Sequence, residues 1–483
     1  MERPNDYESI TTLDISQEEK NLYVSYYNEE GKTDFKIFTL EPSDMFNWEI
    51  CDEGDKDADP LIKNWNGKSV KKARTKYLNR YRLLEYVENL PQFHKDTIFS
   101  YNFPKTYFID IEVEVTDAFP EPSKAENPIT AICVVTPERQ CVVLATKPLS
   151  NTQQKEIQKR IDNHFESIDD DFVFMFKHFN TEYDMLYTFL QSFVRKFPMM
   201  TGWNFVNFDW KYIVNRSAKL GIDIAISSPI DKTFGQDKFP CHVGVMDYLD
   251  IYAKWDRTVD IKEDFKLDTV GEAVIGIKKV KYDGTIQDLY EKDYLKYIFY
   301  NVIDTALVYL IHKKIKTMDI ALTISHMSKI SIFKAASPVA ITESLLAREF
   351  LSKNMVMAVD PKAKESKREQ FEGAFVKEPT VGMHNAVAAF DFASLYPSIM
   401  RQLNVSPESF IKKVKPELRE KEKSDDKIVS VTGAVYTTER SILKDVLTRL
   451  YSQRKEYKKE SFKYQQLAYD LEQKIKKSEH SLS

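Results

Sequence analysis

Two acidic residues interrupt an apolar segment of the sequence, YFIDIEV at 107–113. Side chains alternate between the two faces of a strand, so Asp110 and Glu112 fall on one face, roughly 6 to 7 Å apart. Like charges in an apolar segment repel each other and are costly to remove from water unless a cation compensates them. Carboxylate oxygens are the ligands that Mg²⁺ and Mn²⁺ prefer. The pair therefore predicts a divalent-metal site, and a solvent-facing edge strand is the alternative interpretation.

Two further acidic residues lie on elements that could carry them to such a site. In GWNFVNFDWKYI, Asp209 stands where a strand is expected to pass into a helix, five residues after Asn204. In YIFYNVIDTALVYL, Tyr300 and Asp304 are four residues apart and share one face of an expected helix. Taken singly, Asp209 is explained as a helix N-cap and the second pair as a tyrosine beside a surface acid. Together, the order D-x-E, N-x-x-x-F-D and Y-x-x-x-D is hard to obtain by accident.

This order of motifs resembles the 3′→5′ proofreading exonuclease of family B DNA polymerases, which implies a ribonuclease H-like fold. The resemblance implies that two Mg²⁺ or Mn²⁺ ions are held by the carboxylates of Asp110, Glu112, Asp209 and Asp304. Such ions would activate water and stabilise the leaving 3′-oxygen during phosphodiester hydrolysis. The resemblance also implies that Tyr300 orients the attacking water and that Asn204 and Phe208 position the terminal nucleotide.

A second acidic pattern is FDFASLYPSIM at 390–400. Asp391 stands near the end of an expected apolar strand, 386–392, and the chain then turns into a helix whose amides favour phosphate. The pattern resembles polymerase motif A of the same family, which implies that Asp391 binds metal shared with a nucleoside triphosphate. It also implies that the nucleotide is bound by Ser394, Leu395 and Tyr396, with Tyr396 excluding a 2′-hydroxyl. A strand and helix with a capping serine is the alternative.

Residues 441–477 contain neither Gly nor Pro and are expected to form one long helix. Its apolar residues recur about every 3.5 positions, a seam that needs a partner because an exposed apolar stripe favours aggregation. The segment LYSQRKEYKKE resembles the first fingers helix of the family. The resemblance implies that the β- and γ-phosphates of the incoming nucleotide are gripped by Arg454, Lys455 and Lys458. A charged solvent-exposed face is the alternative.

Two motifs of the family do not occur in the sequence, K-x-x-x-N-S-x-Y-G of the second fingers helix and D-T-D of the palm. One palm carboxylate cannot hold two metal ions, so synthesis by this chain alone is not expected. We therefore expect the N-terminal subunit of a split polymerase, with a truncated fragment as the alternative. A second chain would supply these motifs, the thumb and the contact with a sliding clamp.

The resemblance extends over most of the chain, is weakest over residues 1–100, and is to the replicative polymerases of T-even-type bacteriophages. It implies primer-template DNA, single-stranded 3′ ends and deoxynucleoside triphosphates as partners, in the cytoplasm of a bacterial host. Two other functions remain open. One is a stand-alone 3′→5′ exonuclease with an inert palm segment, and the other is a non-catalytic DNA-binding scaffold.

The composition is that of a multidomain globular protein: 483 residues, of which 42% are hydrophobic and 30% charged, with a net charge of −5. No apolar run reaches the roughly 18 residues of a membrane span. The four cysteines show no C-x-x-C spacing, which favours a reducing cytoplasm.

The expected fold class is multidomain α/β, in four parts. Short apolar runs predict a small α+β domain over 1–104, to which 317–362 returns, and the polar stretch 55–82 is expected to be a solvated helix. Alternating strands and helices predict the exonuclease domain over 105–316. A charged linker, KAKESKREQ, and a turn at Gly373 follow; the turn lies in FEGAFV, where Phe371 replaces the Tyr of many relatives. A partial palm with motif A would occupy 363–440 and the first fingers helix 441–483.

Overall fold

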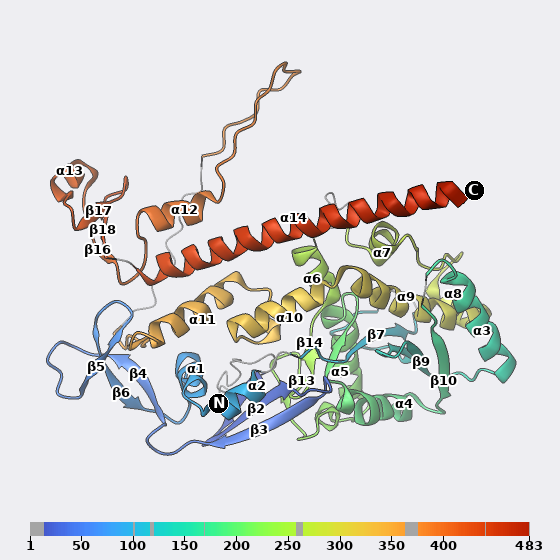
Figure 1. Ribbon diagram of the computed structural model, residues 1–483. Helices are drawn as coiled ribbons and strands as arrows, with labels where there is room; N and C mark the ends of the chain where they lie inside the picture. The colour runs from blue at the N-terminus through green and yellow to red at the C-terminus, as the bar shows by residue number, and fades with distance from the viewer. Residues whose placement is uncertain are drawn as a thin grey trace. The chain divides into compact units, whose positions relative to one another are not determined.

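The computed structural model describes residues 14–99, 102–115, 120–168, 170–256, 264–362, 375–439 and 441–482. The chain divides into two compact units, Met1–Phe46 with Arg74–Leu345 and Asn47–Ala73 with Leu346–Ser483. Both contain helices and strands, so the fold is mixed α/β (Figure 1). Within the described ranges, no helix combines the length and the apolar character that crossing a membrane requires.

A six-stranded mixed sheet forms the core of the first unit. Its spatial order is β10 (Val173–His178), β9 (Gln140–Ala145), β8 (Ile129–Val135), β7 (Thr106–Val113), β11 (Met199–Thr201) and β14 (Gly244–Val245). Strands β7, β8 and β9 pair antiparallel, whereas β10, β11 and β14 join in parallel. Strand β8 is buried along its whole length, as an apolar run in the middle of a covered sheet should be.

Helices cover both faces of this sheet, because its strands place apolar side chains on each. Phe108 of β7 packs into one buried cluster, and Ile109 and Ile111 pack into the other. The helices on the Phe108 face include α3 (Asn151–His164), α6 (Tyr248–Trp255), α7 (Leu267–Ile275), α8 (Ile286–Lys292), α9 (Tyr294–Ile315) and α10 (Thr317–Ser328). The helices on the opposite face include α4 (Glu182–Thr188) and α5 (Lys211–Lys219). The strand expected around Asp110 and Glu112 and the helix expected around Tyr300 and Asp304 are confirmed as β7 and α9.

The rest of the first unit includes a second, antiparallel sheet and two short helices. The sheet consists of β1 (Asp14–Glu18), β2 (Asn21–Tyr27) and β3 (Thr33–Thr39), and α1 (Arg80–Glu88) and α2 (Gln92–Ile98) follow. Helix α1 begins at Asn79, whose side chain accepts a hydrogen bond from the Arg82 amide, an ordinary N-cap.

The solvated helix expected over 55–82 is wrong. The structure has β5 (Ala58–Asn64) and β6 (Ser69–Arg74) there, in a four-stranded sheet ordered β15 (Met355–Val356), β5, β6 and β4 (Phe46–Ile50). A tight turn closes the hairpin: Gly67 adopts φ +83° and its amide donates to the Asn64 carbonyl. This left-handed turn, which glycine adopts without strain, interrupts the helix that the polar composition suggested.

The second unit also contains a small sheet and three helices. Strands β16 (Phe410–Lys413), β18 (Ala434–Thr437) and β17 (Lys427–Val429) pair antiparallel in that order. The helices are α12 (Leu395–Gln402), α13 (Arg419–Glu422) and α14 (Ile442–Leu482), while α11 (Pro338–Leu351) spans the boundary between the units. The long helix expected over 441–477 is confirmed. Ile442 and Val446 at its start pack against Phe350 in a small buried cluster.

The strand expected over 386–392 is wrong. The chain there has no strand partner among the described residues, and Phe390 is 95% exposed. A strand needs a neighbour for its amides and carbonyls, and apolar residues alone do not provide one. Most of the expected linker, together with Phe371 and Gly373 of the expected turn, lies outside the described residues.

Candidate active site: a buried carboxylate cluster

Strand β7 supplies two of the sequence-predicted acidic residues. Asp110 is half-buried and Glu112 is buried, and both lie on the face of β7 that packs against α9. They lie opposite Cys133 and Ala131 of β8 in the antiparallel register. These small neighbours leave room above the sheet for the two carboxylates.

Asp209 reaches the same strand from a π-helical turn, Val206–Trp210, that precedes α5. Its carboxylate is buried and accepts a hydrogen bond from the Ile111 amide at 3.0 Å. That amide is available because β11 pairs with β7 only as far as Phe108. The chain then leaves β11 through Gly202, where a Cβ would lie 2.3 Å from the Ile109 carbonyl oxygen. The absence of a side chain at Gly202 thus allows the close approach that brings Asp209 to β7.

Helix α9 supplies the fourth carboxylate. Asp304 is buried, and the Tyr300 hydroxyl, one turn earlier, is hydrogen-bonded to it. Asn301, also on α9 and fully buried, donates from Nδ2 to Oδ2 of Asp110 at 2.7 Å. The α9 helix is thereby linked to β7 across the carboxylate cluster, which we define as Asp110, Glu112, Asp209 and Asp304.

The four carboxylates lie close enough for their charges to interact. Burial, followed by the charges of Asp110 and Asp304, raises the pKa of Glu112 well above its usual range. Burial and the nearby Asp304 raise the pKa of Asp110 to about 7. Burial also raises the pKa of Asp209 strongly, with Asp110 contributing. The ionised forms of these acids are costly because the site is buried and the charges of the acids repel one another.

A lysine ammonium group lies beside the carboxylate cluster. The Lys279 ammonium is 2.5 Å from Oδ2 of Asp304 and 4.9 Å from the centre of the Tyr300 ring. Burial acts to lower the pKa of Lys279, but Asp304, with Asp110 and Glu112, outweighs this and leaves the pKa above its ordinary value. Burial raises the pKa of Asp304, and Lys279 opposes that rise.

The described carboxylates are not arranged as a complete metal-binding site in the structure. Among the described residues, no three or more His, Cys, Asp or Glu side chains are arranged to hold a metal ion. Several carboxylate oxygens face internal donors: the Ile111 amide, the Asn301 amide and the Lys279 ammonium. The donor chemistry nevertheless fits a hard divalent cation, and Oδ1 of Asp304 is buried without a hydrogen-bond partner. The carboxylate cluster could therefore hold such cations.

Asn204 and Phe208 lie on the loop and turn that lead to Asp209. Asn204 has a left-handed backbone, φ +61°, and its amide donates to Oδ1 of Asp247 at 3.1 Å. The Val206 amide donates to Oδ2 of the same carboxylate at 3.0 Å. Phe208 is half-buried, with its ring 6.1 Å from that of Tyr212.

Three residues of this site were not identified from the sequence: Asn301, Lys279 and Asp247. Asn301 could have been found, because it precedes Asp304 by three positions and so shares its helix face. Lys279 lies in the lysine-rich run KKVK, which gives no sign of which side chain turns inward. From the sequence, Asp247 could only be recognised as a possible helix N-cap. It is one, because its side chain accepts a hydrogen bond from the Leu249 amide at the start of α6.

The structure does not bring the motif A residues into a comparable cluster. Asp391 is exposed, and its carboxylate makes no hydrogen bond or ion pair with another described residue. Ser394 precedes α12 in a left-handed conformation, φ +52°, and Leu395 and Tyr396 on α12 are exposed. Helix α12 packs against α14, where the Arg401 guanidinium lies 4.7 Å from the centre of the Tyr451 ring. Further along α14, three basic side chains are exposed: Arg454, Lys455 and Lys458.

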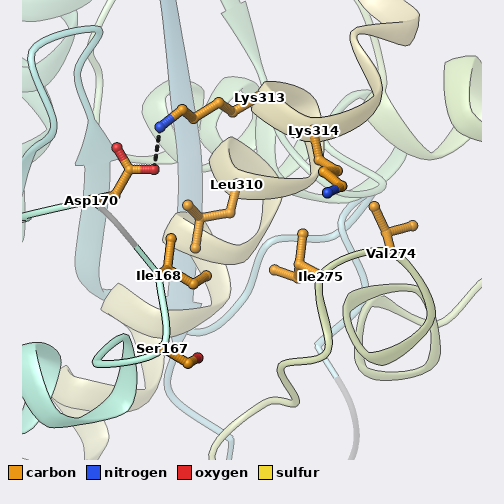
Figure 2. Close-up of a pocket in the computed structure, with 8 residues that line it drawn as sticks. All are labelled: Ser167, Ile168, Asp170, Val274, Ile275, Leu310, Lys313 and Lys314. Carbon is orange, nitrogen blue, oxygen red and sulfur yellow. Dashed lines mark hydrogen bonds and ion pairs between the residues drawn. The ribbon is translucent and has the colours of Figure 1, made fainter. Parts of the chain in front are cut away.

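A separate pocket of about 460 Å³ lies beside the last turns of α9 (Figure 2). Within it, both oxygens of the buried Asp170 are already paired, with Lys313 at 2.5 Å and Arg139 at 3.1 Å. None of the four clustered carboxylates lines this pocket, so it is not part of the candidate active site. It is lined by Ser167, Ile168, Asp170, Val274, Ile275, Leu310, Lys313 and Lys314.

Comparison with known proteins matches two segments of the chain to one family. Residues 69–270 match "DNA polymerase family B, exonuclease domain", and residues 331–477 match "DNA polymerase family B". Asp110, Glu112 and Asp209 lie in the first segment and Asp391 in the second, whereas Tyr300 and Asp304 lie between the two.

Individual relatives agree with this match. The DNA-directed DNA polymerase of Escherichia phage RB69 is 30% identical over 378 residues, covering 72% of this chain and 41% of the relative. The DNA-directed DNA polymerase of Enterobacteria phage T4 is 28% identical over 419 residues, covering 80% and 46%. The DNA polymerase of Thermococcus gorgonarius is 29% identical over 240 residues, covering 48% and 31%. The chain spans less than half the length of these relatives.

Proposed function

The chain belongs to DNA polymerase family B, and we propose that it carries a metal-dependent 3′→5′ exonuclease that acts on the 3′ ends of single-stranded DNA. One observation carries this proposal: four acidic residues from three distant stretches of sequence lie in one cluster, and burial raises the pKa of each of them. Perturbed acids of this kind are typical of sites that do chemistry. The spatial order of the six-stranded sheet supports a ribonuclease H-like fold for this part of the chain.

The residues of the carboxylate cluster would hold two Mg²⁺ or Mn²⁺ ions, which supply an activated water and charge stabilisation for the leaving 3′-oxygen. Tyr300 keeps its proton, since burial and Asp304 raise its pKa, so its hydroxyl remains a donor that orients water beside Asp304. Without a metal ion, Lys279 supplies positive charge next to the same carboxylate. Asn204 and Phe208 position the terminal nucleotide from the loop and turn that carry Asp209.

We further propose that the second unit contributes half of a replicative polymerase site. Asp391 would bind metal, and the incoming deoxynucleotide would contact Ser394, Leu395, Tyr396, Arg454, Lys455 and Lys458. A second polypeptide would supply the missing palm carboxylate and fingers motif, and through it a sliding clamp would be engaged. The exposed extended segment before α12 and the exposed apolar residues of α14 support such a partner. We also propose that the chain acts in the cytoplasm of a bacterial host.

Substitution of Asp110 and Glu112 on β7 tests whether the carboxylate cluster is the exonuclease active site. The double variant Asp110→Asn with Glu112→Gln should lose at least about 100-fold of its Mg²⁺-dependent activity, because losing two ligands removes several kcal/mol of charge stabilisation. The measurement is the initial rate of shortening of a 5′-labelled single-stranded oligonucleotide. Glu114→Gln is the matched control, since Glu114 lies two residues further along the chain and outside the carboxylate cluster. A double variant as active as Glu114→Gln would exclude the proposed site.

Substitution of Asp391 separates the polymerase proposal from a stand-alone exonuclease. In the presence of a polypeptide that carries the missing motifs, Asp391→Asn should abolish primer extension while leaving degradation of single strands unchanged within about twofold. The two activities are measured on the same labelled primer with and without deoxynucleotides. Failure of the unsubstituted pair to extend a primer would favour the stand-alone exonuclease instead.

A further inference from the structure

The carboxylate cluster holds a cation before any metal is added. The Lys279 ammonium lies 2.5 Å from Oδ2 of Asp304, and the charges of Asp110 and Glu112 also act on it. Its side chain is about one quarter exposed, so the stem is covered while the head faces the acids. Lys279 is held on the loop between α7 and α8, where its backbone amide donates to Oδ1 of Asp268 at 2.7 Å.

We propose that Lys279 is the counter-ion of the metal-free site and leaves Asp304 when a divalent cation binds. This inference rests on the proposed function, because it concerns the same four carboxylates. The ammonium and a metal ion would compete for the same oxygen, Oδ2 of Asp304. A divalent ion at that oxygen would repel the ammonium and would also replace the hydrogen bond that holds it, which favours departure of the lysine head.

The side chain of lysine suits this exchange. Its ammonium is a compact charge at the end of a flexible four-carbon stem, which can swing away while the backbone stays in place. The Tyr300 ring, 4.9 Å from the ammonium, offers it a second favourable contact close to Asp304. Tyr282 on the same loop packs edge-on against the Tyr300 ring at 5.3 Å, which anchors the loop during the exchange. Lys279 thus stabilises the metal-free cluster and lowers its affinity for the metal.

Amine labelling of the unsubstituted protein tests the exchange directly. In EDTA the Lys279 ammonium is ion-paired and should react slowly with an acetylating reagent, whereas Mn²⁺ should raise its rate of labelling about fivefold or more. The rate is measured by mass spectrometry on peptides that contain Lys279. Lys281, exposed on the same loop, is the internal control and should not change. An unchanged or slower rate at Lys279 with Mn²⁺ bound would overturn the proposal.

Direct Mn²⁺ titration gives an independent readout. Lys279→Met should bind Mn²⁺ about fivefold or more tightly, because the competing charge is gone, while Lys279→Arg and Lys281→Met should bind like the unsubstituted protein. Equal affinity in Lys279→Met overturns the exchange but leaves the proposed function standing. An unsubstituted protein that binds no Mn²⁺ overturns both.

Discussion

Asp247 shows how a residue outside the carboxylate cluster can fix one member of it. Its carboxylate accepts three amides, those of Asn204, Val206 and Leu249. It therefore joins the loop that leads to Asp209 to the start of α6. Burial raises the pKa of Asp247 to about 6, so the group remains ionised and a strong acceptor at neutral pH.

Replacing Asp247 should loosen that loop. Asp247→Asn keeps the shape but directs an NH₂ group at amide donors, and we expect a loss of about 1–3 kcal/mol in the free energy of unfolding. Urea unfolding measures this loss, and exonuclease rate should fall with it because Asp209 is no longer held. Asp250→Asn, an exposed change on the same helix, is the control. Equal stability of the two variants would contradict the anchoring role.

His242 should make the protein sensitive to mild acid. Its buried ring donates from Nε2 to the Val194 carbonyl, and burial lowers the pKa of His242 to about 4. The folded pKa lies below the unfolded value of about 6.5, so the stabilisation is present above pH 6.5 and is lost as pH falls towards 4. Between pH 7 and 5 the loss should be about 2 kcal/mol.

Urea unfolding at the two pH values measures this dependence. His242→Gln should reduce the difference between pH 7 and 5, whereas His178→Gln, an exposed change at the end of β10, should leave it intact. A His242→Gln protein with the pH dependence of the unsubstituted chain would show that His242 is not its source.

The sequence predicted which acids would lie close together but not what surrounds them. Asp110 and Glu112 could be recognised because strand alternation puts them on one face of an apolar segment. The Asn301 side chain that bonds Asp110 is 191 positions away, and only the packing of α9 on β7 brings the two together. Lys279 is separated from Asp304 by a turn and a helix, so its inward orientation is a property of the loop, not of its residue type.

Among the helices and strands, the predictions were correct where the apolar side chains of a segment are buried by neighbouring elements. Strand β7 and helix α9 are buried along most of their length, and both were expected. The errors fell on segments whose structure depends on a partner or on one glycine. Residues 386–392 are apolar but have no strand beside them among the described residues, and a turn at Gly67 makes residues 58–74 a hairpin.

Helix α14 should be stable at its start and labile further on. Ile442 and Val446 are buried, whereas Tyr457, Phe462 and Leu471 are at least half exposed. A helix gains most of its stability from packing, so amides over 455–475 should exchange with solvent at least about 100-fold faster than those of α9. Hydrogen exchange followed by mass spectrometry measures both in one sample. Protection over 455–475 equal to that of α9 would mean that this stripe does not need a partner.

In the molecule as a whole, the two units differ in whether their candidate site residues are buried together or exposed. The first contains a covered sheet with its acids already gathered. The second presents Asp391 and the basic residues of α14 in exposed positions. This difference fits a chain that spans less than half the length of its curated relatives: its first activity is proposed to be self-contained and its second to depend on further polypeptide.

Degradation of a 5′-labelled single-stranded oligonucleotide by this chain alone tests the exonuclease assignment most directly. With Mg²⁺ or Mn²⁺ we expect a ladder of products that shorten one nucleotide at a time from the 3′ end, and no products in EDTA. A folded chain that binds the strand but leaves it intact with either metal would contradict the assignment of the four carboxylates.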